Sequence, residues 1–556
     1  MATGAIARPA HRPKHYSGLL EWLLTTDHKK IGIMYLVFTV LFMLIGGVLA
    51  LLVRTQLAWS DNTFLSQYEY NQFFTMHAST MLFLFVIPVG AGFGNYMLPL
   101  MIGAKDMAYP RINAMSLWLI PLAAAFMFSS FFVEGGSASA GWTSYAPVTL
   151  KTFAPGHGQD LWILGVQILG ISSVGGGINF IVTTMTMRAP GMTLGRMPIF
   201  VWMVIVTSVL VVFATPVLAS VLTMLFFDRN LGTNFFNPRE GGNPILYQQL
   251  FWFYSHPAVY IMILPAMGIV SEVLPVFSRK PLFGYKAVAY AGAAIGILGF
   301  TVWMHHMFAT GLSMTLTTVT MATTMMIAVP SGVKMFNWLG TLWYGSLVFK
   351  TPLYFAVGFL FLFLIGGVDG VFHAVVPIDY AINDTYWVVS HIHYVLFGGS
   401  VFGVFAGIYY WFPKMTGKFL DETLGKVHFW LMFVGMNLAF MPMHVLGLKG
   451  MPRRIADYQS GNGWEWWNLI STIGAFTIAV SLLFFLFNFA KSLMAAPKTA
   501  GDDPWEGNTL EWMTSSPPPE HNFDRLPAIH SERPAFDDRM LREHYRPEPA
   551  GSTTGH

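Results

Sequence analysis

The chain contains no cysteine and little charge. With Cys 0 among 556 residues, disulfides, thiolate nucleophiles, iron–sulfur clusters and thiolate-bound metals are excluded within this chain. Any metal that it binds must therefore use histidine, carboxylate or similar ligands. Charged residues make up 11% of the sequence, whereas soluble domains have about 25%. The net charge of +3 gives no reason to expect a nucleic-acid partner.

Apolar residues dominate what is present. Hydrophobic residues make up 54% of the chain, and the 18 Trp and 48 Phe suit lipid-facing surfaces and interfacial aromatic belts. A span needs about 20 apolar residues to cross about 30 Å of hydrocarbon. The sequence therefore predicts an all-α integral membrane protein, a bundle of twelve transmembrane helices near 30–54, 70–102, 112–134, 160–186, 198–227, 246–276, 284–311, 316–345, 351–376, 384–412, 425–447 and 466–492.

The basic residues of the connections predict the orientation. Connections on the side of the N-terminus carry more Lys and Arg than those on the other side, which places both termini in the cytoplasm. We expect a cytoplasmic N-terminal segment at 1–29, the twelve-helix catalytic domain at 30–495, and a polar, Pro-rich and loosely ordered cytoplasmic tail at 496–556. The basic N-terminus lacks the short apolar core of a cleaved signal peptide, so the first span is expected to be retained.

Histidines inside the predicted spans give the strongest functional signal. A neutral imidazole is poorly suited to lipid and is a good metal ligand. At 1.5 Å per residue, all of them lie roughly 10 to 15 Å below the outer surface. One intramembrane histidine can simply bond a neighbouring carbonyl, but independent structural histidines have no reason to share a depth. The set predicts a buried metal or haem centre formed by His77, His256, His305, His306, His391 and His393.

The spacing of these histidines sorts them into groups. His305 and His306 are adjacent, about 100° apart on a helix, so both can reach one metal together with an imidazole from another helix. Three imidazoles with an open position suit copper or zinc. His391 and His393 are about 200° apart, so they point to opposite faces of their helix. That geometry predicts two separate irons in two planar cofactors.

Several motifs resemble the haem–copper oxidase superfamily, specifically subunit I of the A-type cytochrome c oxidases. They are WMHHMFATG, HPAVY, SHIHYVLFG, FTMHAST and GMPRR, together with TTDHKKIGIMY, GFGNYMLPL, TMRAPGMT and IAVPSGVKMFNW. The resemblance runs from about Asp27 to Tyr458. It implies two haems of the a type and one copper in this subunit, with dioxygen bound between the high-spin iron and the copper. The implied ligands are His77 and His393 for the low-spin haem, His391 for the high-spin haem, and His256, His305 and His306 for copper.

A tyrosine and a lysine extend the predicted centre. Tyr260 follows His256 by four residues, on the same helical face, and a phenol beside a redox metal can supply a proton and an electron. The resemblance implies a covalent bond between the two side chains. Lys334 lies in the inner half of the eighth span, where a lysine costs about 2.5–3.5 kcal/mol. A water-lined path is expected, with snorkelling to the inner surface as the alternative, and the resemblance assigns Lys334, Ser331 and Ser271 to a proton route to Tyr260.

A second proton route is implied by the resemblance around Asp106. Alone, this loop carboxylate would be an ordinary solvated group, but GAKDMAYPRIN matches the family's other proton entrance. The route's polar positions are Asn95, Asn113, Ser172, Ser173 and Asn179.

The sequence departs from the family pattern at the inner end of this route. Most A-type members have a glutamate two residues after the copper-ligating histidine, where this chain has Ala258. FWFYSHPAVY resembles a bacterial subgroup in which Tyr254 and Ser255 stand in for that glutamate. Two hydroxyls can order water and relay protons, although neither holds a negative charge cheaply near neutral pH. Coupling to proton pumping depends on this substitution.

Polar residues near the outer ends of the spans complete the expected cofactor site. Alone, Arg453 and Arg454 could equally be interfacial anchors. The resemblance implies that they hold haem propionates through charge-assisted bonds, that Arg54 contacts a formyl group of the low-spin haem, and that Trp142 packs near a propionate. Asp384 resembles a magnesium ligand at the interface with a second subunit.

The resemblance implies the catalytic subunit of a terminal respiratory oxidase. Electrons from cytochrome c, or from a membrane-bound cytochrome, would reduce dioxygen to water with proton uptake and pumping. The implied partners are a subunit II with a copper site that receives electrons, a subunit III and further oxidase subunits, and the lipid bilayer. The YSHPAVY variant disfavours a mitochondrial chain and favours a bacterial inner membrane.

Three alternatives remain open. A quinol oxidase would share this subunit almost unchanged. A nitric oxide reductase is disfavoured because Tyr260 and Lys334 have no role expected there. A proton-coupled transporter could use intramembrane histidines as a relay, and it would be colourless when purified.

Overall fold

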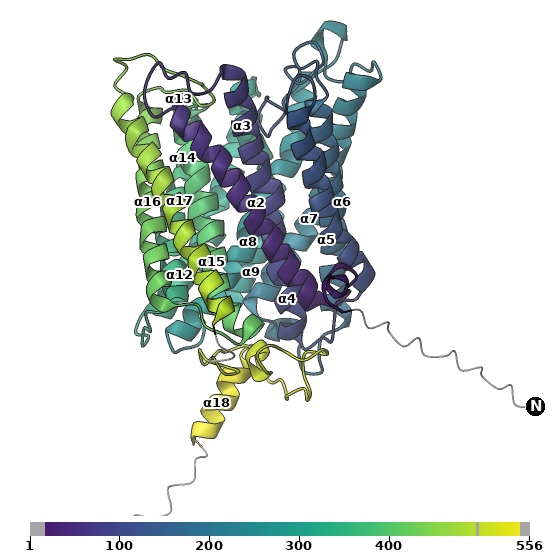
Figure 1. Cartoon of the computed structure of the whole chain (residues 1–556), viewed down its shortest axis with the longest axis vertical. Helices are drawn as coiled ribbons and strands as arrows, with labels where there is room; N and C mark the ends of the chain where they lie inside the picture. Colours follow the sequence, from purple (N-terminus) through teal and green to yellow (C-terminus); the bar gives the residue numbers. More distant parts are fainter. Residues whose placement is uncertain (1–16, 496–499, 545–556) are drawn as a thin grey trace, which may run out of the picture.

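The computed structural model describes residues 17–495 and 500–544 (Figure 1). Residues 1–16 of the predicted N-terminal segment, and residues 496–499 and 545–556 of the predicted tail, lie outside the described residues. The described part of the chain is all-helical, with no β-strand and one isolated bridge between Thr385 and Pro452.

Twelve helical segments are long and apolar enough to cross a membrane, which confirms the predicted all-α bundle of twelve transmembrane helices. In chain order they are α2 (His28–Gln56); α3, η1 and α4 (Gln67–Ser79, Thr80–Val86, Ile87–Ile102); α5 and η2 (Pro110–Ser129, Ser130–Phe132); α6 (Gly158–Thr186); α7 (Ile199–Asn230); α8 (Pro244–Phe277); α9 and η5 (Tyr285–Gly299, Trp303–Thr310); α10 and α11 (Met314–Met326, Ala328–Leu342); α12 (Thr351–Ala374); α14, η6 and α15 (Tyr386–Val395, Leu396–Val401, Phe402–Thr416); α16 (Glu422–Leu448); and α17 (Glu465–Met494). Shorter helices are α1 (Leu19–Leu23), η3 (Leu194–Arg196), η4 (Pro238–Glu240), α13 (Val376–Ile382), η7 (Leu510–Met513) and α18 (Pro534–His544).

Side-chain caps explain where several spans begin. Asp27 accepts a hydrogen bond from Lys29 N at the start of α2 (2.7 Å), and Asp421 does the same for Thr423 N and Leu424 N at the start of α16. Ser66 forms a capping box at the start of α3. Each cap satisfies backbone N–H groups that a helix leaves unpaired in its first turn.

We call the end of the bundle at which α2 begins the proximal end, and the opposite end the distal end. The described N-terminal residues and the C-terminal helix α18 both lie at the proximal end (Figure 1). An even number of spans requires this, because each span reverses the direction of the chain.

Three spans depart from α-helical geometry next to the predicted ligands. The π-helical segment η1 begins three residues after His77, and η6 begins three residues after His393. His305 and His306 lie in the 3₁₀ segment η5, which Gly311 ends with φ of 82°. The expectation that these two side chains project from an α-helix is therefore wrong. A 3₁₀ turn has three residues, so adjacent side chains are about 120° apart, and π segments of this kind commonly occur at functional sites.

The expectation of a loosely ordered tail is wrong for residues 500–544. Trp505 Nε1 donates to the carbonyl of Tyr410 (2.9 Å), and Trp512 Nε1 donates to its hydroxyl (2.8 Å). Leu510 is fully buried. The apolar side chains of PWEGNTLEWM therefore pack at the proximal end of the bundle, against Tyr410 of α15. Two tryptophans in a polar segment were the sequence signal for this packing.

Glycines allow the last two spans to pack closely. A Cβ atom on Gly474 of α17 would lie 2.2 Å from Ala439 N of α16, and one on Gly435 would lie 2.9 Å from Ile478 N. Backbone atoms cannot move away as a flexible side chain can. Small residues at such crossings let membrane helices approach each other.

We predict that Gly474→Ala destabilises the bundle, because α16 and α17 must separate to admit the methyl group. Overpacking of this kind costs about 1–3 kcal/mol, more than the gain of about 1 kcal/mol in helix propensity. The measurement is the thermal unfolding midpoint in detergent. Gly176→Ala in α6, where nothing lies within 4 Å of the added Cβ, is the matched control. Equal midpoints for the two variants would contradict the prediction.

Candidate metal centre

One cavity of 1310 Å³ runs through the distal half of the bundle and extends along α11 as far as Leu339. Typical ligand pockets measure about 300–1,000 Å³, so this one has room for more than one large group. Side chains from α2, α3, α8, α12, α14 and α17 contribute to its wall. Every intramembrane histidine singled out from the sequence lines it, namely His77, His256, His305, His306, His391 and His393.

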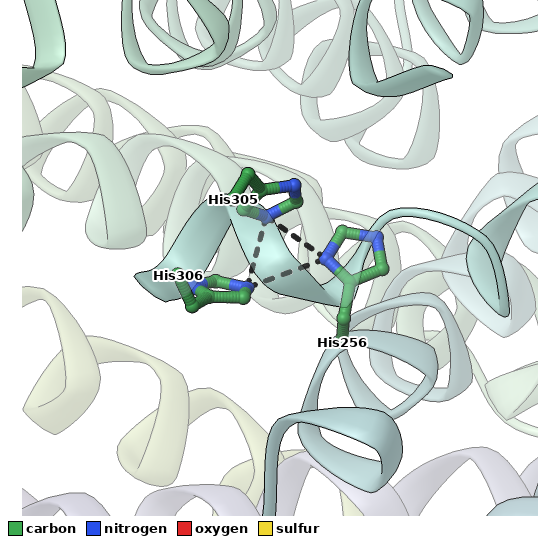
Figure 2. Close-up of side chains that lie close together, drawn as sticks. All are labelled: His256, His305 and His306. Atoms are coloured by element: carbon green, nitrogen blue, oxygen red, sulfur yellow. Dashed lines mark hydrogen bonds between the residues drawn. The ribbon is translucent and has the colours of Figure 1, made fainter. Parts of the chain in front are cut away.

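Three of these histidines form a tight cluster between α8 and η5. His256 Nδ1 lies 3.1 Å from His305 Nε2 and 3.3 Å from His306 Nε2, and the last two atoms are 3.0 Å apart (Figure 2). A neutral imidazole nitrogen is either an N–H or a lone pair, so at least two of the three must be alike and repel each other. A cation bound by three lone pairs removes that repulsion. Within the described residues, this is the one group of three or more metal-ligating side chains of the His, Cys, Asp or Glu type.

His77 and His393 form a second, different arrangement. Their rings are nearly parallel (6°), with centroids 6.3 Å apart. His77 Nδ1 donates to the Gly46 carbonyl (2.8 Å), and His393 Nδ1 donates to the Val389 carbonyl (2.7 Å). Each Nε2 therefore carries the free lone pair. Metal-ligating histidines commonly donate their other ring nitrogen to a carbonyl in this way.

His391 lines the same cavity from the side of α14 opposite to His393. Its Nδ1 is buried without a hydrogen-bond partner among the described residues. Its neighbour His373, whose ring centroid lies 5.0 Å away, was not among the predicted site residues. Asp379 Oδ1 lies 3.1 Å from His373 Nδ1 and orients that ring. The signal was an additional histidine near the end of the ninth span.

Further side chains hold the histidine cluster in place. Trp252 stacks on His306 with centroids 3.8 Å apart and planes 11° apart. Thr324 Oγ1 lies 3.1 Å from His305 Nδ1. Tyr260 lies beside His256, with ring centroids 4.8 Å apart. The contact with Tyr260 follows from its i+4 position, whereas Trp252 and Thr324 were missed. Trp252 lies four residues before His256 on the same face, and this spacing was the available signal.

Arginines bring positive charge to the cavity wall. Arg54 is 6% exposed, and its Nη2 donates to Asn468 and Thr472, whereas its Nε and Nη1 have no partner among the described residues. Arg454 also lines the cavity. Burial and the charge of Arg453 lower the Arg454 pKa to about 10, which leaves it charged at neutral pH. Unsatisfied guanidinium groups favour an anionic or carbonyl ligand.

The other predicted outer residues lie nearby. Trp142 lines the cavity and packs edge-on against Trp252 (5.9 Å). Arg453 also lines the cavity, and it pairs with Asp384 through two nitrogens at 2.5 and 2.7 Å. The Asp384 side chain is 73% exposed, so it faces outward from the bundle.

Lys334 is fully buried and points into the bundle, which excludes the snorkelling alternative. Its Nζ lies 2.9 Å from Met203 Sδ. Ser331, one turn earlier, lines the main cavity. Ser271 is buried and accepts a hydrogen bond from Trp338 Nε1 (2.9 Å). The three predicted residues thus lie along one side of α8, proximal to Tyr260.

A second, smaller cavity of 60 Å³ lies at mid-depth. Asn95, Ser172 and Ser173 line it, and the Oδ1 of Asn95 has no partner among the described residues. One water needs about 10–15 Å³ of such space, so the cavity can hold several. Asn113 and Asn179 do not line it. Asn179 instead bonds the backbone of Tyr109.

Tyr254 and Ser255 are buried next to the histidine cluster. Tyr254 is 5% exposed, Ser255 is 0% exposed, and the hydroxyl of Ser255 has no partner among the described residues. A buried hydroxyl without a partner is costly. An ordered water beside Ser255 would remove that cost.

Asp106 lies in the proximal loop between α4 and α5 and is partly buried. It accepts a hydrogen bond from Met107 N (2.6 Å). Burial raises the pKa of the Asp106 carboxyl to about 6, because a low-dielectric environment disfavours the charged form. The carboxyl can therefore bind and release protons near neutral pH.

A helical bundle that gathers imidazoles around one internal cavity defines a membrane metalloprotein. The family model described as "Cytochrome C and Quinol oxidase polypeptide I" matches residues 30–477. The chain belongs to this family, within the haem–copper oxidases, which confirms the predicted resemblance.

Individual relatives agree with this assignment. Cytochrome c oxidase subunit 1 of Thermostichus vulcanus is 50% identical, covering 94% of each chain. Its counterpart in Synechocystis is 52% identical, covering 90% of each chain. A cryo-EM structure of a heme-copper terminal oxidase dimer shares the fold, with a TM-score of 0.72 and 20% identity over 85% of each chain. Because these relatives are cytochrome c oxidase subunits, the chain is assigned as an oxidoreductase. The roles of its individual residues are still predictions.

We predict that Asp106 titrates with a midpoint near 6 rather than near 3.8. The infrared carboxylic-acid band that distinguishes the wild type from Asp106→Asn should be present at pH 5 and disappear as the pH rises through 6. A spectrum at pH 5 with only the carboxylate band would contradict the burial of this group.

Proposed function

We propose that the chain is the catalytic subunit of a terminal oxidase that reduces dioxygen to water with electrons from cytochrome c. The single observation that carries the proposal is the cavity in which all six histidines present nitrogens in three arrangements: a converging trio, a parallel pair and one separate ring. Membership of the oxidase family and the names of the relatives support the reaction.

The donor set fits two haems and one copper ion. His77 and His393 would hold the low-spin haem, since their rings are nearly parallel with centroids 6.3 Å apart and each Nδ1 is bonded to a carbonyl, which leaves Nε2 free as a ligand. His391 would hold the high-spin haem, and the trio would hold copper. When bound, these groups supply the electron transfer and dioxygen binding that amino-acid side chains lack. The protein supplies their position, the exclusion of bulk water and the protons.

The arginines fit the peripheral groups of such cofactors. Arg453 and Arg454 would bind haem propionates, with Trp142 packed beside them. The two unpartnered nitrogens of Arg54 would donate to a formyl oxygen, which favours a haem of the a type. A charge-assisted bond at a buried site contributes about 1.5–3 kcal/mol, enough to orient the haem.

Tyr260 and His256 are the proposed catalytic side chains. The Tyr260 ring lies against the imidazole of His256, so its phenol can hold a proton next to the site of dioxygen reduction. This contact also supports the proposed covalent bond between the two rings. In that position, the Oη atom can give up its proton and one electron together.

Two routes would bring protons from the proximal side. Lys334, Ser331 and Ser271 would form one of them, which would lead to Tyr260. Because the lysine ammonium has only sulfur acceptors nearby, water is needed to solvate it.

The second route would begin at Asp106 and pass the small cavity lined by Asn95, Ser172 and Ser173. Tyr254 and Ser255 would order water beyond that cavity. Asn113 and Asn179 would contribute to this route near its entrance at Asp106.

The proposed setting is a bacterial inner membrane with both termini in the cytoplasm, so that the proximal end faces the cytoplasm. Electrons would arrive through a subunit II that carries copper, with a subunit III and further subunits in the complex. Magnesium at Asp384 would need ligands from subunit II, because Arg453 already pairs with this carboxylate and Asn383 stands beside it.

A quinol oxidase is the second candidate, because the family model covers both enzymes. The names of the 50–52% identical relatives favour cytochrome c as the donor. A two-cysteine copper motif in subunit II would decide for cytochrome c, and its absence would decide for quinol.

We predict that the purified complex shows strong visible haem bands. Each copy of this chain should bind two a-type haems and one copper ion, not counting the copper of subunit II. His305→Ala should lose this copper and keep both haems, and His77→Ala should lose the low-spin haem. Pyridine extraction measures the haem content, and metal analysis measures the copper content. A colourless protein would support the transporter alternative instead.

We predict that Tyr254→Phe with Ser255→Ala slows turnover and proton release in vesicles by at least about tenfold, because a proton relay commonly contributes about 10²–10⁴-fold. Tyr290→Phe, at a residue 69% exposed on α9, is the matched control. Copper content should stay unchanged in both variants. Undiminished turnover and proton release in the double variant would mean that protons bypass these hydroxyls.

A further inference from the structure

Asn522 anchors the C-terminal segment in the proximal face of the bundle. Its side chain is 0% exposed, and its φ of 72° is a left-handed conformation that asparagine tolerates better than most residues. Nδ2 donates to the Ala104 carbonyl (2.8 Å) and to His28 Nε2 (2.9 Å). Oδ1 accepts from Lys29 Nζ (3.1 Å). One tail side chain thus connects α2 to the loop that carries Asp106.

Asn522 contacts the two loop residues just before Asp106 and also His28 of α2. Ala104 and Lys105, whose carbonyls accept from Nδ2 at 2.8 and 3.4 Å, directly precede this carboxylate in the chain. His28 Nδ1 donates to the Asn95 carbonyl (2.7 Å). A continuous set of hydrogen bonds therefore runs from the tail, through His28, to the wall of the small polar cavity.

The tail also packs against the start of this loop without spare room. A Cβ on Gly103 would lie 3.0 Å from Leu526 Cδ1 and 3.4 Å from Leu510 Cδ2. Both leucines belong to the C-terminal segment. The tail is therefore part of the covering that keeps water away from the loop.

The Lys29 ammonium at the start of α2 acts electrostatically on Asp106, and the tail accepts two hydrogen bonds from it. Lys29 Nζ bonds the Glu520 carbonyl (2.9 Å) and Asn522 Oδ1 (3.1 Å), and it pairs with Asp27 Oδ1 (3.3 Å). An ammonium group has three N–H donors; two of them go to these tail oxygens, and the charge is paired with Asp27. These contacts hold the Lys29 ammonium against the tail and Asp27.

We propose that Asn522 is a positioning residue of the proton entrance: together with the Glu520 carbonyl, it holds the Lys29 ammonium beside Asp27 and away from the Asp106 carboxyl. The proposal deepens the proposed function and rests on Asp106 as a proton entrance. The charged groups of the α2 start that act on Asp106 are Asp27 and Lys29, while His28 contributes through its backbone N–H; Lys105 is the neighbour of Asp106 in the loop.

The pKa of the Asp106 carboxyl depends on where the positive charge of Lys29 lies. In the described arrangement, the charge of Asp27 raises the pKa of the Asp106 carboxyl and the charge of Lys29 lowers it. Without Asn522, the Lys29 ammonium loses one acceptor and can turn to the Asp106 carboxylate. An opposite charge within about 4–6 Å lowers a carboxyl pKa by about 1–3 units, which would leave Asp106 deprotonated at neutral pH.

The test is the infrared titration of the Asp106 carboxyl in the intact complex. In Asn522→Ala, the midpoint should fall by about 1–3 units. Lys29→Met in the same chain should restore it, because no ammonium remains to pair with Asp106. Asn508→Ala is the matched control, since this buried tail asparagine bonds within the tail, to Ala535, Phe536 and Arg539. It should leave the midpoint unchanged.

An unchanged midpoint in Asn522→Ala would overturn the proposal. A lowered midpoint that Lys29→Met does not restore would overturn it as well, because general opening of the loop would then be the cause. If Asn522→Ala does not accumulate, Asn522→Ser takes its place, and a midpoint between those expected for the wild type and the alanine variant would support the proposal.

Turnover separates this proposal from the proposed function. Asp106→Asn should slow proton uptake and turnover if Asp106 is a proton entrance. Normal turnover in Asp106→Asn would remove that role, whereas the infrared midpoints would still show whether Asn522 controls the charge near the carboxyl. Slow turnover in Asp106→Asn with an unshifted midpoint in Asn522→Ala would leave the proposed function intact and refute the inference.

Discussion

Imidazole nitrogens that are buried with free lone pairs are the constraint on which the rest of this structure depends. In hydrocarbon, a polar group without a partner costs several kcal/mol. The bundle nevertheless aims three ring nitrogens at one point and leaves His391 Nδ1 without a partner among the described residues. A cation bound by the lone pairs of the three converging nitrogens would remove the repulsion among them. The unpartnered nitrogens of Arg54 make the same demand for an anion or a carbonyl oxygen.

The backbone departs from α-helical geometry at three places next to these histidines. The π segments η1 and η6 follow the two parallel histidines, and the 3₁₀ segment η5 carries His305 and His306. A regular α-helix offers about 100° between neighbours, and a 3₁₀ turn offers about 120°. Trp252 and Thr324 then fix the two rings from either side of the cluster.

The proximal end of the bundle is organised by charge rather than by metal ligands. Asp106, Lys29 and Asp27 lie where three chain segments meet: the start of α2, the loop after α4 and the C-terminal tail. The tail contributes Asn522 and two tryptophans that dock on Tyr410. A segment more than four hundred residues away in the sequence therefore bonds to the loop that carries Asp106.

Local sequence was sufficient for features that depend on composition and spacing. Twelve apolar runs determined the number of spans, because each must cross the same hydrocarbon thickness. The i+4 relation predicted the contact between His256 and Tyr260, since helical geometry alone sets it. Only the tertiary structure decided the 3₁₀ turn at His305, the stacking of Trp252, the proximity of His373 to His391 and the docking of residues 500–544. These features arise from contacts between segments distant in sequence, and no periodicity within one segment encodes where another segment will pack.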